Sequence, residues 1–117
     1  MSPSTHPALR EAVRLILGML VNRDYVGIER VTWGRRLTAA ELERAVQEYG
    51  GVELTLPPSI ELENLEVIRV SGAEPPRYAV ATDLWTISGR SDLTLELELA
   101  ENHPGLYDIE VTNLHVL

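Results

Sequence analysis

The chain has 117 residues and no cysteine, and 18 acidic residues against ten basic ones give a formal net charge of −8. This length is typical of a single domain, here residues 1–117, which buries a core without disulfides or metals. The lack of cysteine excludes thiolate metal sites and a cysteine nucleophile. The acidic balance argues against a nucleic-acid partner, since binders of the phosphate backbone carry basic patches.

The N-terminal segment does not match the pattern of a targeting signal. Its apolar run over residues 13–21 is interrupted by Arg14 and Gly18. A signal peptide needs an unbroken apolar stretch, and a membrane span needs a longer one. We therefore expect a cytoplasmic protein that does not bind a membrane.

Three helices are predicted in the first half of the chain. The first follows a cap at Ser4 or Thr5, and Asp24 can cap a short second helix over residues 25–31. The apolar residues of the first helix recur at helical spacing: Leu9, Val13, Ile16, Leu17 and Leu20. The third helix opens at Thr38 and Glu41, which match a capping box.

Strands follow the helices. They are predicted over residues 65–71, 77–86, 93–100 and 106–116. Short loops between successive strands favour antiparallel pairing. The order indicates an α+β fold, with about three N-terminal helices packed on one face of a curved, mainly four-stranded antiparallel sheet. This element order resembles the cystatin-like and nuclear-transport-factor-2-like rolls, which carry many functions.

A strand register follows from the alternating leucines of residues 93–99. Pairing Thr86 with Leu93 across a turn at 88–92 places Thr82 opposite Leu97, and a second hairpin places Leu99 opposite Tyr107. Both pairings put the leucines on one apolar face. The apolar residues near the C-terminus stay in phase only if a β-bulge lies near residues 112–113.

The opposite face then gathers carboxylates and a tryptophan. Its members are Asp83, Trp85, Glu96, Glu98, Asp108 and Glu110. Asp83, Glu96 and Glu110 are expected in one row, and on these strands only Arg69 and Arg77 offer compensating charge. This pattern predicts a surface for a basic protein partner; the plainer interpretation is a solvated face. Carboxylates on a flat sheet diverge, so we expect no metal, and no motif indicates a cofactor.

A second candidate site is a pocket between the helices and the sheet. Pairing Ile68 with Val80 places Glu66 beside Thr82, and His115 is the only histidine in a regular element. A buried carboxylate is a candidate acid or base, although exposure at a strand end is the simpler account of Glu66. No convincing acid–base pair emerges, so catalysis stays open and binding is favoured.

Three stretches resemble an uncharacterised family of small bacterial proteins classed as a domain of unknown function. They are "GRRLTAAELERAVQEYGG", "DLWTISGRSDLTLELEL" and "IEVTNLHVL". The resemblance implies a bacterial cytoplasmic protein and transfers no site residue. Small acidic α+β proteins of bacteria also include immunity proteins, which neutralise a toxin by binding it.

We therefore expect a small acidic protein-binding module of the immunity-inhibitor type. The alternative is a small-molecule-binding or enzymatic roll that uses the pocket. Like charges would repel across a two-fold axis, so a monomer or weak homodimer is expected.

Overall fold

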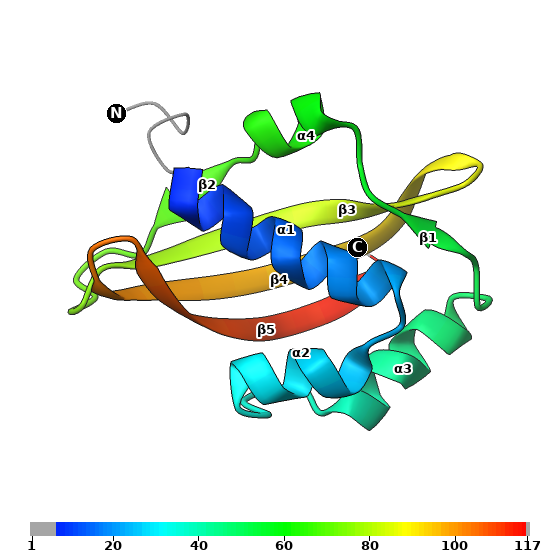
Figure 1. The fold of residues 1–117 in the computed structure, drawn as a ribbon, viewed down its shortest axis with the longest axis horizontal. Helices are drawn as coiled ribbons and strands as arrows, with labels where there is room; N and C mark the ends of the chain where they lie inside the picture. Colours follow the sequence, from blue (N-terminus) through cyan, green and yellow to red (C-terminus); the bar gives the residue numbers. More distant parts are fainter. Residues whose placement is uncertain (1–6, 117) are drawn as a thin grey trace.

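The computed structural model describes residues 7–116 of the chain and shows an α+β fold (Figure 1). Within that range the elements follow in this order: α1 (Pro7–Val21), α2 (Tyr25–Thr32), α3 (Ala39–Glu48), β1 (Leu54–Thr55), α4 (Ser59–Glu63), β2 (Val67–Arg69), β3 (Arg77–Thr86), β4 (Gly89–His103) and β5 (Leu106–Val116). The predicted fold class is confirmed, with α4 and the two-residue β1 added. The predicted cap of α1 at Ser4 or Thr5 lies outside the described residues.

Local side-chain bonds start α2 and α3 where they were predicted. Asp24 accepts a hydrogen bond from the Gly27 N–H at 2.9 Å. At α3, Thr38 Oγ1 accepts from the Glu41 N–H at 3.3 Å, and Glu41 Oε1 accepts from the Thr38 N–H at 2.9 Å. This bond to the Thr38 backbone also holds the pKa of the Glu41 carboxyl below its usual value. The capping box is therefore confirmed.

The sheet is antiparallel and is built around β4. Its order is β1-β3-β4-β5, and β2 also pairs with β3. The four leucines of β4 are buried, and α1 lies across their face of the sheet (Figure 1). Burying these leucines together with the apolar side of α1 supplies the main stabilisation of the fold.

Both hairpins pair two residues away from the expected register. Thr82 lies opposite Leu95 rather than Leu97, and Leu99 lies opposite Ile109 rather than Tyr107. Side chains alternate along a strand, so a slip of two residues leaves each side chain on its predicted face. The leucine face is thus as predicted, although its cross-strand partners are not.

The first slip has its origin in a tighter turn. Thr86 pairs with Gly89 instead of Leu93, so only Ile87 and Ser88 remain in the loop. Thr86 Oγ1 donates to the Gly89 carbonyl at 3.0 Å and accepts from the Ser88 N–H at 3.1 Å. Gly89 has a φ of 117°, a conformation that glycine adopts without steric cost. A β-bulge later in the hairpin then shifts the register between Asp83 and Trp85.

The predicted bulge near residues 112–113 is confirmed. The register of β5 against β4 shifts between Val111 and Asn113, which leaves Thr112 as the extra residue. Leu114 therefore returns to the core, and His115 lies on the opposite face of the sheet.

One edge of β3 is paired at both ends but not in its middle. On this edge β1 pairs with residues 85–86 and β2 pairs with residues 78–80. The chain between them, residues 56–66, leaves the sheet through Pro57-Pro58 and forms α4 beside it (Figure 1). Within the described residues, no strand pairs with positions 81–84 on this edge. We call the space left there the β3-edge pocket.

No helix in the part of the chain that the structure describes is long and apolar enough to cross a membrane.

The buried leucines of β4 give a direct test of the core. Leu97 is 1% exposed, whereas Leu106 at the start of β5 is 64% exposed. We expect Leu97→Ala to lower the free energy of unfolding by about 2–5 kcal/mol, because it leaves a cavity. Leu106→Ala should change it by less than about 0.5 kcal/mol. Urea denaturation measures both, and equal losses would contradict this placement of the core.

Candidate functional site

The outer face of the sheet, turned away from the leucine core, carries the residues predicted to bind a partner. Alternation along the paired strands places six of them there: Asp83, Trp85, Glu96, Glu98, Asp108 and Glu110. Their mutual arrangement differs from the prediction, because both hairpins slip. Asp83 lies opposite Thr94 instead of Glu96, so the expected row of three carboxylates does not form.

Glu98 and Glu110 lie directly opposite each other on β4 and β5. Two like charges in this position repel. Arg77, at the start of β3, relieves the repulsion, because its Nη1 lies 3.1 Å from Glu98 and 3.6 Å from Glu110. A single guanidinium therefore bridges both carboxylates.

Two further arginines reach Glu110 from the connector between α2 and α3. Arg35 Nε lies 3.9 Å from the Glu110 carboxylate and Arg36 Nε lies 3.6 Å from it. Arg35 also donates to the Ile109 carbonyl at 3.4 Å. The Glu110 side chain is only 17% exposed. Of the two arginines expected to offset this face, Arg77 does so, and the contribution of Arg35 and Arg36 from outside the strands was not predicted.

The other carboxylates of the outer face also have partners. Glu96 contacts the His115 ring, and Asp108 accepts a hydrogen bond from Asn102. Asp83 pairs with Arg90 at 3.0 Å and accepts from the buried Thr94 hydroxyl at 2.9 Å. Asp83, Glu98 and Glu110 are thus paired with arginines, whereas Glu96 and Asp108 contact an imidazole and an amide.

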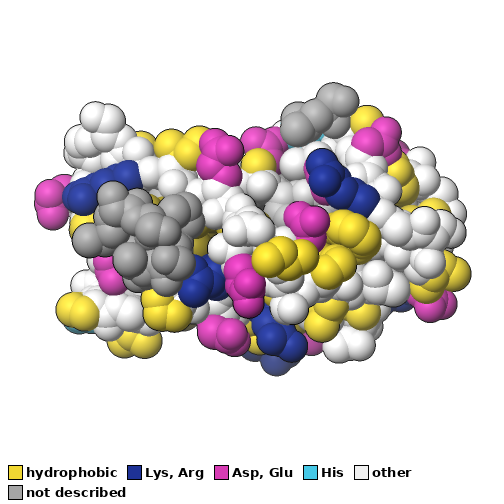
Figure 2. Space-filling model, turned by 90° about the horizontal axis from the view of Figure 1, so that it is seen from above, with side chains coloured by type: hydrophobic (Ala, Val, Ile, Leu, Met, Phe, Trp, Pro, Cys, Tyr) yellow, Lys and Arg dark blue, Asp and Glu magenta, His cyan; other side chains and the backbone are white. Residues whose placement is uncertain are grey.

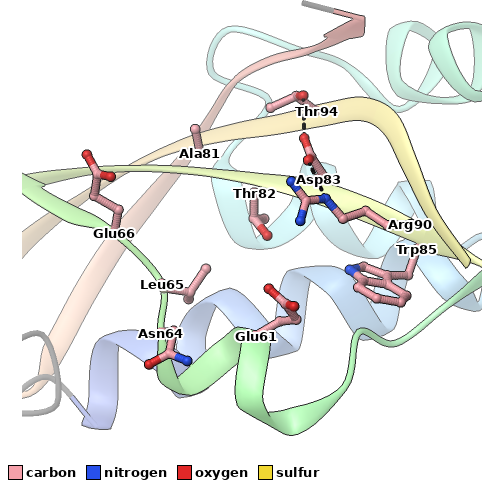
Figure 3. A pocket seen from close by; sticks show the side chains of 10 residues that line it. All are labelled: Glu61, Asn64, Leu65, Glu66, Ala81, Thr82, Asp83, Trp85, Arg90 and Thr94. Carbon is pink, nitrogen blue, oxygen red and sulfur yellow. Dashed lines mark hydrogen bonds and ion pairs between the residues drawn. The ribbon is translucent and has the colours of Figure 1, made fainter.

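The β3-edge pocket is a hollow of about 220 Å³ between β3 and α4 (Figure 3). Glu61 from α4 and Trp85 from β3 lie at one end of it, and Glu66 lies toward the other (Figure 3). Leu65 and Thr82 line the space between these two ends. Acidic groups and an aromatic ring therefore converge on one hollow.

Both sites predicted from the sequence contribute to this pocket. Asp83 and Trp85 come from the predicted partner-binding face, and Glu66 and Thr82 come from the predicted alternative pocket. Glu66 is exposed just before the start of β2, as the simpler account held. The predicted pairing of Ile68 with Val80 is wrong, because Ile68 pairs with Ala79 and Val67 pairs with Val80. His115 does not line this pocket.

Six of the ten residues that line the pocket were not predicted as site residues, and two of the six carry a charge. Glu61 lies on α4, a helix of five residues that is too short to show a periodic pattern. Arg90 was assigned to a turn beside Asp92, but it lies on β4 and pairs with Asp83. The sequence Pro57-Pro58 precedes α4, and no predicted element covered this helix.

Much of the excess negative charge lies in the middle of the sequence, in a stretch that includes Glu61 and Glu66 of the pocket. Residues 41–74 hold eight of the 18 acidic residues and two of the ten basic ones. Among residues 7–116, no basic side chain forms an ion pair with Glu61 or Glu66. Figure 2, which views the α4 side of the molecule, shows acidic side chains set among basic and apolar ones. Glu61 and Glu66 are therefore carboxylates of the pocket that have no ion-pair partner among these residues.

Within residues 7–116, no three acidic or histidine side chains converge closely enough to hold a metal ion. The pocket offers carboxylates, hydroxyls, an amide and an indole, together with the Arg90 guanidinium, which is paired with Asp83. This combination attracts an organic cation through charge and through the electron-rich ring.

Comparison with protein families gives one finding. The model of the family described as "Domain of unknown function (DUF7668)" matches residues 17–117. The comparisons with curated proteins and with solved structures give no match.

The charge network of the outer face can be tested through Arg77. Removing its charge leaves Glu98 and Glu110 opposed without their bridge, so Arg77→Met should lower the free energy of unfolding by about 1 kcal/mol. Arg69→Met, at an exposed site on β2, should cost less than about 0.5 kcal/mol. Urea denaturation at low and high salt measures both. Equal effects, or a loss at Arg77 that salt does not reduce, would contradict the network.

Proposed function

The chain belongs to this family of domains of unknown function, and we propose that it is a protein-binding module for a basic partner. The observation that carries the proposal is the β3-edge pocket, where uncompensated carboxylates lie beside Trp85. An inhibitor of the immunity type would fit this role, because such proteins neutralise a toxin by binding it. The proposal places the protein in the bacterial cytoplasm, as a monomer or weak homodimer with a cystatin-like or nuclear-transport-factor-2-like roll.

The pairing of charges decides which part of the outer face is available. A partner's lysine or arginine that approached Glu98 or Glu110 would have to compete with Arg77. At Glu61 and Glu66 no such competitor lies among the described residues. The binding centre is therefore the β3-edge pocket, with Asp83 and Trp85 as the part of the predicted face that it includes.

Charge and aromatic surface have separate roles in this proposal. The net charge of −8 draws a basic partner toward the protein and raises the association rate, more strongly at low ionic strength. Trp85 is half-buried at the pocket, and tryptophans in such positions are enriched among the residues that dominate binding energy.

The alternative is a roll that binds or converts a small molecule. The space between α1 and β4 is filled by buried apolar side chains. A hollow of about 270 Å³ does lie between α3 and the ends of β4 and β5, where Leu93 and His115 line it, but Glu66 and Thr82 are not part of it. The β3-edge pocket, at about 220 Å³, is below the range of about 300–1,000 Å³ that is usual for small-molecule sites. Its size suits one side chain of a partner better than a whole ligand.

Capture experiments with two tryptophan variants test the proposal. The immobilised protein should retain a basic protein from a lysate of the organism that encodes it, identified by mass spectrometry. Trp85→Ala should weaken this binding at least about tenfold, since it removes the proposed anchor. Trp33→Ala is the matched control, because Trp33 is 79% exposed and does not line the pocket.

Two results would overturn the proposal. One is a captured partner that the Trp85→Ala variant retains as well as the wild type does. The other is a captured partner that is not basic and whose retention does not fall at about 0.5 M salt.

A further inference from the structure

We infer that the β3-edge pocket receives a single arginine side chain, stacked on the Trp85 indole with its charge facing Glu61. This inference rests on the proposed function and narrows it to one chemical group of the partner. It follows from the wall of the pocket, from the way Arg90 is held, and from the unpaired stretch of β3.

The wall of the pocket combines a flat ring with a carboxylate. Figure 3 shows Glu61 and Trp85 at the same end, on α4 and β3 respectively. A guanidinium is planar, stacks on aromatic faces and is more weakly hydrated than an ammonium. Arginine is therefore the side chain that uses both the ring and the carboxylate.

The arginine that the pocket already contains does not fill this role. Arg90 lies directly opposite Trp85 in the sheet, but its Nε is 3.0 Å from the Asp83 carboxylate, and its side chain is 60% exposed. Asp83 is itself held by the Thr94 hydroxyl at 2.9 Å. Arg90 is thus neutralised in place and presents little net charge to a guest. An anionic guest would meet Glu61 and Glu66, which have no such compensation.

The edge of β3 adds hydrogen-bond acceptors. On this edge Val70 N–H donates to the Arg77 carbonyl at 2.8 Å. Backbone carbonyls alternate in direction along a strand. The carbonyls of Ala81 and Asp83 therefore point to the same edge as the carbonyl of Arg77. No strand within the described residues pairs with them there. A guanidinium carries five N–H donors against three on an ammonium, which again favours arginine over lysine.

The test uses the full chain with Trp33→Phe, so that Trp85 is the only tryptophan and reports on the pocket. The probes are the N-acetyl amides of arginine, lysine and citrulline; the last resembles arginine in shape but carries no charge. The arginine amide should shift the Trp85 indole N–H signal and change its fluorescence in a saturable way. The lysine amide should bind more weakly, and the citrulline amide should give no saturable change.

Two matched variants test whether the Glu61 carboxylate is the group that faces the arginine side chain. Glu61→Gln should weaken binding of the arginine amide by about fivefold, since it removes the facing carboxylate. Glu63→Gln removes the same charge from α4 at an exposed residue that does not line the pocket, and its effect should be smaller. Equal effects of the two variants, equal binding of arginine and citrulline amides, or equal binding of arginine and lysine amides would overturn the inference.

The inference and the proposed function can fail separately. A saturable Trp85 shift without any captured basic protein would support the pocket assignment and contradict the partner. A captured basic protein that depends on Trp85, with no shift from the arginine amide, would support the partner and contradict the arginine assignment.

Discussion

Four leucines on β4 point to one side of the sheet, and the rest of the molecule is arranged around them. Leu93, Leu95, Leu97 and Leu99 are all buried against the helical layer. Strand geometry then sends the residues between them to the outer face, which is where Glu98 meets the carboxylate of β5. The charge on this face is a consequence of how the core is built. Arginines from β3 and from the α2–α3 connector form ion pairs with these carboxylates and offset their charge.

The interrupted edge of β3 connects the fold to its proposed function. A continuous strand between residues 54 and 69 would have paired along the whole of β3 and left no hollow. Instead, the chain leaves the sheet at Pro57-Pro58 and forms α4. No strand of the described residues then pairs with positions 81–84 on that edge. This path of the chain also places Glu61 opposite Trp85 across the resulting space (Figure 3). Residues 56–66 hold three acidic residues and no basic one, so shape and negative charge coincide at one place.

Local patterns predicted the fold well, and contacts between distant residues were missed. The capping box at Thr38, the apolar side of β4 and the bulge at Thr112 each depend on a few adjacent residues. The hairpin registers slipped because several turn lengths keep the leucines on the same face, and alternation alone cannot choose among them. Arg35 meets Glu110 across more than 70 positions of sequence, and no local pattern encodes such a contact. As a result, the predicted site residues were placed on the outer face, but of the arginines that pair with them only Arg77 was predicted to do so.

The central claim is that the β3-edge pocket, and not the middle of the outer face, carries the negative charge open to a basic partner. The most direct measurement is an amide chemical-shift titration of the labelled protein with a hexa-arginine peptide. We predict that the largest shifts fall on residues 61–66 and 81–85, and that the amides of Glu98 and Glu110 move little. Shifts centred on Glu98 and Glu110, with the pocket residues unchanged, would contradict the account.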